Sequence, residues 1–337
     1  MKAWIIPQWG LENLRIETRQ DPKPGSGEIL IKMKAVSLNY RDLLIVEGKY
    51  NPRMKLPFIP LSDGVGEIVA IGEGVERFRL GQRVCPIFAP RWLAGPPSVA
   101  ELRHSLGGPL DGTLCEYMVL PETAVVEPPE HLSDEEAATL ACAGVTAFSA
   151  LFVYGKVKAG DVVVVLGTGG VSVFALQFAK IAGATVIITS SSDEKLRKMK
   201  ELGADYTINY REKPEWSKEV RRITENRGAD YVVEVGGSAT LKESLKAIRM
   251  DGTIALIGIL SGSSGEVNLL PVLMQNIRIQ GILVGSRHTF EEMNRAISVS
   301  HLRPLIDKVF AFEEFPEALI YLRDQKHTGK VVLRISG

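Results

Sequence analysis

The sequence has only three cysteines in 337 residues. Cys85, Cys115 and Cys142 are widely spaced, and no two of them form a C-x-x-C pair. Disulfide frameworks use a larger and even number of cysteines, and zinc ribbons use closely spaced pairs. The sequence therefore predicts neither a disulfide-stabilised fold nor a structural zinc site.

Net charge and long hydrophobic runs are also missing. Lysine and arginine together number 40, as do aspartate and glutamate, so no overall field attracts nucleic acid or an anionic membrane. The first residues, MKAWIIPQWGLENLRI, lack the apolar core and cleavage site of a signal peptide. No apolar run approaches the roughly 20 residues that span a bilayer. We therefore expect a cytoplasmic protein that binds small molecules rather than nucleic acid or membranes.

Two sequence patterns occur along the chain. Residues 1–124 contain short β-type runs separated by glycine and proline, such as EILIKMKAVSL, which predict a β-rich domain. From about residue 133, apolar runs such as DVVVVL alternate with amphipathic segments, as parallel strands with helical crossovers do. Residues 285–337 resemble residues 1–124 in pattern more than they resemble the middle of the chain. We predict an α/β protein, with a doubly wound parallel six-stranded sheet in residues 125–284 and a β-rich domain formed by the two ends.

Two shorter segments are also distinctive. Residues 91–112 are interrupted by prolines and glycines and predict a surface loop with one short helix, which is a candidate lid or subunit contact. Residues 133–155 predict a helix, because Ser133 and Glu136 have the spacing of a capping box.

The run VVVVLGTGGVSVFALQFAK, residues 162–180, predicts a strand, a glycine turn and a helix. A dinucleotide site needs this order, because the glycines let the backbone approach a pyrophosphate and the helix N-terminus binds it. Ser172 replaces the third glycine of the G-x-G-x-x-G pattern. Ordinary α/β turns also use glycine, but the alternating strands and helices favour a nucleotide. The predicted contacts are Gly167, Thr168, Gly169, Gly170 and Val171.

The end of the next predicted strand indicates which dinucleotide binds. An acidic residue about 20 positions after the glycines binds the ribose hydroxyls of NAD in many such proteins. This sequence has Ser190 and Ser191 there, followed by Asp193 and Lys195. Serines and a lysine would bind a 2′-phosphate that an acid would repel, so we predict NADP(H). Asp193 has an alternative role as the N-cap of the following helix.

Taken together, these features resemble the medium-chain dehydrogenase/reductase family. The resemblance covers nearly the whole chain and is carried by SLNYRDLL, GVGEIVAIGEGV, ACAGVTAFSAL, GTGGVS, GADYTINYRE and GKVVL. It implies a GroES-like catalytic domain, a Rossmann domain and hydride transfer with a nicotinamide cofactor. It also implies a homodimer formed through the run IRIQGILV, with a tetramer as the alternative.

Most zinc ligands of the family's alcohol dehydrogenases are replaced. The matching positions hold Asn39, Ser62 and Asp63, and only Cys142 remains. Arg41 stands where those enzymes have the residue that relays the alcohol proton. Catalytic zinc needs three protein ligands and an open position, so we predict no metal.

The family's zinc-free quinone oxidoreductases are the more similar branch. They have an N-x-x-D motif, here Asn39 to Asp42, and an aromatic residue that Tyr50 matches. The resemblance makes Asn39 a donor to a carbonyl or the nicotinamide, and Tyr50 a proton donor or a pocket wall. Asp42 either lines the site or caps the next helix, and Asp63 is expected to bind Arg41 or another cation. The candidate catalytic residues are thus Asn39, Asp42, Tyr50 and Asp63.

The same resemblance gives further cofactor contacts. Lys195 and Tyr210 match residues that bind the 2′-phosphate, and the remaining candidates are Thr146, Val284, Gly285, Arg287 and Lys330. We therefore predict an NADPH-dependent, zinc-independent reductase of quinones or α,β-unsaturated carbonyls. The alternatives are an alcohol dehydrogenase of the same family, with a partial metal site at Asp63 and Cys142, and a nucleotide-binding protein with little turnover.

Overall fold

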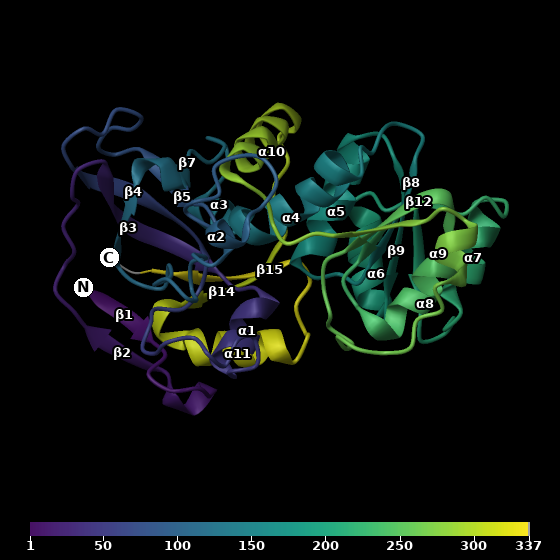
Figure 1. Cartoon of the computed structure of the whole chain (residues 1–337), viewed down its shortest axis with the longest axis horizontal. Helices are drawn as coiled ribbons and strands as arrows, with labels where there is room; N and C mark the ends of the chain where they lie inside the picture. Colours follow the sequence, from purple (N-terminus) through teal and green to yellow (C-terminus); the bar gives the residue numbers. More distant parts are fainter. Residues whose placement is uncertain (336–337) are drawn as a thin grey trace. The chain divides into compact units, whose positions relative to one another are not determined.

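The computed structural model describes residues 1–335, which form two compact units. The first contains Met1–Val145 and the chain from Val284 onward, and the second contains Thr146–Leu283 (Figure 1). Within the described residues, no helix has the length and apolar character needed to cross a membrane.

The first unit is built on a seven-stranded sheet in which most neighbouring strands are antiparallel. A separate pair joins β1 (Lys2–Ile5) to β2 (Arg15–Thr18). In the large sheet β6 (Tyr117–Pro121) pairs with the long strand β3 (Glu28–Ser37). The order of the other strands is β14 (Ile306–Ala311), β15 (Lys330–Arg334), β3, β4 (Asp63–Ile71), β5 (Arg83–Pro86) and β7 (Val125–Val126).

The boundary between the units differs from the predicted one after residue 124. Residues 125–145 lie in the first unit, because β7 pairs with β5 and the short helix α3 (Asp134–Ala137) packs against β3 and β4. Ser133 caps α3, with Glu136 bonded back to the Ser133 N–H at 2.8 Å, as its spacing predicts. The other helices of this unit are α1 (Tyr40–Val46), α2 (Val99–Leu102), α10 (Arg287–Ser300) and α11 (Phe315–Arg323), with short 3₁₀ turns at Leu11–Asn13, Glu122–Ala124 and Phe312–Glu314.

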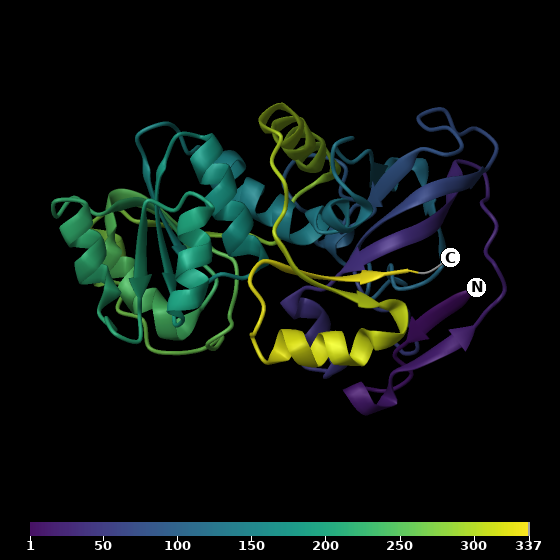
Figure 2. The ribbon, with the colours of Figure 1, turned by 180° about the vertical axis from the view of Figure 1, so that it is seen from behind.

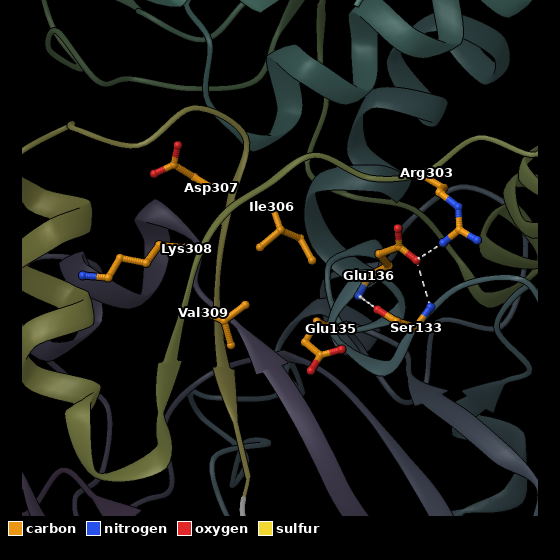
Figure 3. A pocket seen from close by; sticks show the side chains of 8 residues that line it. All are labelled: Ser133, Glu135, Glu136, Arg303, Ile306, Asp307, Lys308 and Val309. Carbon is orange, nitrogen blue, oxygen red and sulfur yellow. Dashed lines mark hydrogen bonds and ion pairs between the residues drawn. The ribbon is translucent and has the colours of Figure 1, made fainter.

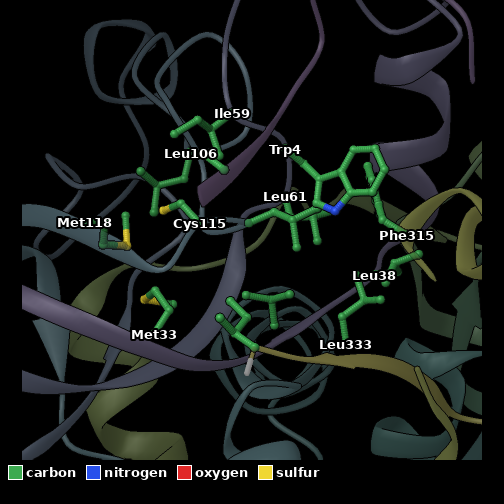
Figure 4. Close-up of a cluster of buried hydrophobic side chains, with 14 of the residues drawn as sticks. Trp4, Met33, Leu38, Ile59, Leu61, Leu106, Cys115, Met118, Phe315 and Leu333 are labelled. Carbon is green, nitrogen blue, oxygen red and sulfur yellow. The ribbon is translucent and has the colours of Figure 1, made fainter. Parts of the chain in front are cut away.

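The core of the first unit follows from the period of two in its strands. Alternate side chains of β3, among them Ile29, Ile31 and Met33, are buried on the same side. They pack with Trp4 and with Phe315 of α11 in one apolar cluster (Figure 4). The strand β15 contributes to the same cluster, so the late part of the chain completes the first unit.

The second unit contains the predicted parallel sheet of six strands, which confirms the α/β fold. Runs such as VVVVL are buried almost throughout because helices cover both faces of the sheet (Figures 1 and 2). The strand order is β10 (Tyr206–Asn209), β9 (Thr185–Ser190), β8 (Val162–Leu166), β11 (Ala229–Glu234), β12 (Ile248–Leu256) and β13 (Arg278–Gly281).

The helices of the second unit connect these strands. Trp216 and Val220 of α7 pack with Leu241 and Leu245 of α8 against one face of the sheet. The strand order reverses at β8, and ligands of such sheets bind beyond the carboxyl ends of the strands at this point. The helices are α5 (Gly170–Ile181), α6 (Asp193–Glu201), α7 (Trp216–Ile223), α8 (Ser238–Ala247) and α9 (Leu270–Met274).

Candidate functional site

The glycine turn lies at the carboxyl end of β8 and opens into α5. Gly167 has φ of 73°, a left-handed conformation that favours glycine. Gly169 has an ordinary φ of −78°, and a Cβ atom there would meet no heavy atom within 4 Å. The turn therefore leaves open space around Gly169, beside the N-terminus of α5.

Ser172 has a structural role that explains why serine replaces the third glycine. Its side chain is buried, and its hydroxyl donates to the carbonyl oxygen of Leu166 at 2.7 Å. This bond ties the first turn of α5 to the end of β8.

Two of the predicted 2′-phosphate residues, Ser190 and Tyr210, lie together at the ends of two paired strands, whereas Lys195 lies in the first turn of α6. The N–H of Tyr210 donates to the carbonyl of Ser190 at 3.0 Å, and the Tyr210 side chain is exposed. Ser192 is the N-cap of α6, since its Oγ accepts from the N–H of Lys195 at 3.4 Å. The alternative role of Asp193 as that cap is therefore wrong, and its carboxylate instead accepts from Asn209 at 2.8 Å.

Two buried hydroxyls lie where the long helical segment enters the second unit. Here short π-helical stretches, Leu140–Gly144 and Ser149–Tyr154, flank the α-helical turn α4 (Val145–Phe148). The hydroxyls of Thr146 and Ser149 are buried and have no hydrogen-bond partner. Unpartnered buried hydroxyls and π-type turns are both features of ligand sites. Sequence reasoning selected Thr146 and missed Ser149, although the spacing of three residues on a helix was a usable signal.

A polar cluster occupies the interior of the first unit, centred on Asp63 at the start of β4. Asp63 is fully buried, and its Oδ1 accepts from the Ser62 hydroxyl at 2.7 Å. Its Oδ2 accepts from the backbone N–H of Cys142 at 3.0 Å. The ammonium nitrogen of Lys330, the first residue of β15, lies 3.8 Å from the same oxygen. The predicted cation partner of Asp63 is thus Lys330 rather than Arg41.

Lys330 connects Asp63 to Asn39. The Lys330 side chain is buried, and its ammonium donates to the carbonyl of Leu38 and to Asn39 Oδ1, both at 2.7 Å. Asn39 is the N-cap residue of α1, and its Nδ2 is buried without a hydrogen-bond partner. The cluster therefore contains one amide NH2 group whose N–H donors no protein group uses.

Asp42 takes the capping role that was one of its two expected roles. Its Oδ2 accepts from the Asn39 N–H at 2.8 Å, while its Oδ1 has no hydrogen-bond partner and lies 3.8 Å from Arg41. Burial raises the pKa of Asp42 to about 6, although the charge of Arg41 partly opposes that rise.

Arg41 binds the later part of the 91–112 segment. Its guanidinium donates to the carbonyls of Leu106 and Gly108 and to the hydroxyl of Ser105. It also lies over the rings of Tyr50 and Phe88, at 5.2 and 4.8 Å from their centroids. The prediction of a surface loop with a short helix describes residues 93–104, where α2 buries no residue, but it is wrong for the buried residues 105–108.

The donor set does not fit a catalytic zinc ion. Burial raises the pKa of the Cys142 thiol, which opposes the thiolate form that binds zinc. Asp63 is already held by three groups, one of them cationic. Among residues 1–335, no group of three or more histidine, cysteine or acidic side chains could hold a metal.

The remaining predicted cofactor contacts lie in the first unit. Val284 is buried, and Arg287 donates to the carbonyl of Thr123 at 3.1 Å from the start of α10. Cofactor binding by Val284, Gly285 and Arg287 stays a prediction.

In a surface hollow beside α3 and β14, the carboxylates of Glu136 and Asp307 are already engaged by other residues (Figure 3). Glu136 there accepts from Arg303 at 2.7 Å and from the Ser133 N–H at 2.8 Å. Asp307 accepts from the Tyr321 hydroxyl at 2.6 Å. Because these charges already have partners, the hollow is a weaker candidate than the polar cluster.

Comparison with known proteins matches both units. Residues 25–130 match the alcohol dehydrogenase GroES-like domain, and residues 170–298 match the zinc-binding dehydrogenase domain. A zinc-type alcohol dehydrogenase-like protein of Schizosaccharomyces pombe is 45% identical over 97% of this chain and 96% of its own length. An acryloyl-coenzyme A reductase of Sulfurisphaera tokodaii is 30% identical over 99% of this chain and 100% of its own. The crystal structure of an NAD-dependent alcohol dehydrogenase superposes with a TM-score of 0.92, at 34% identity and full coverage of both chains.

Proposed function

Because this chain belongs to the medium-chain dehydrogenase/reductase family, we propose that it reduces quinones or α,β-unsaturated carbonyls with NADPH and without zinc. Membership makes it a nicotinamide-dependent oxidoreductase. The observation that carries the finer proposal is the polar cluster, in which the Lys330 ammonium lies beside Asp63 and leaves the amide NH2 group of Asn39 unused.

The choice of NADPH rests on residues at the carboxyl ends of β9 and β10. Ser190 and Ser191 stand where an acid would select NAD, and Lys195 and Tyr210 are the expected 2′-phosphate contacts. The glycine turn and the unpartnered hydroxyl of Thr146 would hold other parts of the nucleotide. When bound, the reduced nicotinamide supplies the hydride.

Asn39 is the proposed donor to the substrate oxygen. As hydride reaches the β-carbon of an unsaturated carbonyl, negative charge builds on the oxygen. A buried Nδ2–H stabilises that charge strongly because it is fixed in advance and poorly solvated. The same donor serves a quinone oxygen.

The α-carbon then needs a proton. Tyr50 is exposed and near Arg41, so either its hydroxyl or water delivers that proton. Neither route requires a metal.

The names of the relatives favour two substrate classes. One relative is named an acryloyl-coenzyme A reductase, a name that describes reduction of an unsaturated thioester, and others are named alcohol dehydrogenases. We favour the unsaturated carbonyl because most of the zinc ligands, and the residue that relays the alcohol proton, are replaced in this chain.

We also propose a homodimer formed through the free edge of β13. This strand ends the sheet, and exposed apolar side chains occur on it and in the chain segments just before and after it. Such a surface is typical of an interface. We call it the β13 patch; it comprises Leu269, Leu270, Leu273, Met274, Ile279 and Leu283.

An acceptor panel tests the proposed reaction. The purified protein is assayed for NADPH oxidation with quinones, enones, enoyl thioesters and simple aldehydes, before and after a strong chelator, and its metal content is measured. We expect turnover with a quinone or an unsaturated carbonyl that survives chelation. Stoichiometric zinc together with loss of turnover on chelation would establish the alcohol dehydrogenase alternative. NADPH binding without any turnover would instead establish a nucleotide-binding protein with little turnover.

Asn39→Asp is the matched variant for this assay. It keeps an oxygen for Lys330 and removes the amide donor, and the carboxylate charge that it adds also repels a developing oxyanion. We expect kcat to fall roughly 100- to 1,000-fold, as for loss of one oxyanion donor, with little change in the Kd for NADPH.

A further inference from the structure

We propose that Lys330 is a positioning residue that orients the amide of Asn39, so that its N–H donor rather than its oxygen is available to the substrate. The inference rests on the proposed function. It assigns Lys330 a role through Asn39, in place of the direct cofactor contact expected from the sequence.

Strand pairing brings the two residues together. In the antiparallel pair of β15 and β3, Val332 lies opposite Ser37. Continuing this register by two residues places Lys330 opposite Asn39, just beyond the end of β3. The N–H of Leu38 also donates to the carbonyl of Val331 at 3.0 Å, so the pairing extends to the site.

The chemistry of the ammonium group fixes the amide. An ammonium has three N–H donors and no acceptor, so it can bond only the oxygen of a neighbouring amide. Lys330 bonds Asn39 Oδ1 at 2.7 Å, and this leaves Nδ2 as the free end of the amide. A flipped amide would set N–H donors against each other in a buried site.

Asp63 keeps the ammonium in place. It is fully buried, and Ser62 and the Cys142 N–H orient its carboxylate. The carboxylate thereby balances the buried charge of Lys330 at 3.8 Å. Asp63 thus orients Lys330, and Lys330 orients Asn39; of these three residues only Asn39 contacts the substrate.

The position of Lys330 argues against a phosphate contact. Only 3% of its side chain is exposed, and two of its three N–H groups are used by Leu38 and Asn39. A phosphate would have to displace these bonds or Asp63.

A double-mutant cycle tests the inference. Lys330→Met is measured alone and combined with Asn39→Ala, with kcat, KM and the Kd for NADPH as readouts. We expect Lys330→Met to lower kcat at least tenfold in the native background and less than twofold in the Asn39→Ala background, with the NADPH Kd changed less than twofold. Equal losses of kcat in both backgrounds, or a tenfold rise in the NADPH Kd with kcat retained, would overturn it.

Two further variants separate positioning from folding. Lys330→Gln keeps an N–H donor, and we expect it to regain at least threefold of the kcat that Lys330→Met loses. If Lys330→Met fails to fold, the cycle is run with Asp63→Asn added to every member, which removes the unpaired buried carboxylate. If Lys330→Gln regains no kcat and the cycle with Asp63→Asn shows no coupling between Lys330 and Asn39, the positioning role of Lys330 is refuted.

A measurement without turnover separates this inference from the proposed reaction. The side-chain amide of Asn39 is followed by NMR in protein labelled with ¹⁵N-asparagine and assigned with Asn39→Asp. We expect its resonances to shift in Lys330→Met and to stay in Lys308→Met, a lysine of the neighbouring strand β14. Unchanged resonances in Lys330→Met would refute the inference even if quinones or enones are reduced, whereas a shift in a protein that turns nothing over would refute only the reaction.

Discussion

Asp42 carries a buried carboxyl group that one N–H bond only partly compensates. Its Oδ1 has no hydrogen-bond partner, and burial raises its pKa to about 6. The folded protein therefore binds this proton more tightly than the unfolded chain, in which an aspartate titrates near about 3.9. The resulting stabilisation is present at low pH and is lost as the pH rises through about 6.

Asp42→Asn tests this linkage. The amide retains an oxygen for the Asn39 N–H and does not titrate. We expect the free energy of unfolding of the native protein to fall by about 2 kcal/mol relative to the variant between pH 4 and pH 7. Denaturant titrations of both proteins across that range measure the difference. Parallel pH profiles would show that Asp42 has an ordinary pKa.

The sequence identified some site residues and missed the relations between them. Asn39 and Asp42 were predictable, because a four-residue motif holds both and the N-cap geometry is local. The bond from Lys330 to Asn39 spans 291 positions and depends on the pairing of β15 with β3, which no local pattern encodes. The catalytic roles of Asn39, Asp42, Tyr50 and Asp63 stay predictions.

At the scale of elements, the two glycines of the turn between β8 and α5 have different roles, one in the fold and the other in the proposed nucleotide binding. Gly167 needs its left-handed conformation, whereas Gly169 does not, and a methyl group at Gly169 would project into open space. That space is where a pyrophosphate would lie close to the backbone.

Gly169→Ala should leave the fold intact and weaken nucleotide binding. We expect an unchanged melting temperature without ligand and a rise of about tenfold or more in the Kd for NADPH, measured by fluorescence titration. Thermal unfolding of the unliganded variant is the internal control. Unaltered affinity would mean that the nucleotide does not approach this turn.

The types of the strands and helices were easier to predict than the burial of residues within segment 91–112. Strands such as β8 and β9 are short apolar runs between helices, a pattern that depends on burial alone. The proline and glycine content of 91–112 correctly indicated irregular structure. It could not reveal that Arg41 binds residues 105–108, because that burial depends on a charged group elsewhere in the chain.

At the scale of the whole molecule, the β13 patch predicts the oligomeric state. We expect the protein to sediment as a homodimer and Leu273→Lys to shift it toward monomer, because a charge on the patch opposes burial. Val299→Lys, on the exposed side of α10, is the matched control and should leave the dimer intact. A native monomer, or equal effects of both substitutions, would contradict the proposal; a tetramer would call for a second interface.

The two-unit organisation was visible in the sequence, but the boundary was not. The sequence pattern changes near residue 133, whereas the compact units divide between Val145 and Thr146. Helical periodicity continues across that point through α4, so composition cannot mark it. Residues 125–145 belong to the first unit because they contact strands from much earlier in the sequence, such as β5 and β3.

The strand β15 lies inside its sheet, between β14 and β3, although it is synthesised after every other strand that the structure describes. Residues 146–283 are complete before it is synthesised, so a nascent chain can finish the second unit while the first still lacks an interior strand. Chains that stall before Lys330 would therefore retain the glycine turn but lack the lysine that balances the charge of Asp63, and cellular quality control would meet them as incompletely folded proteins.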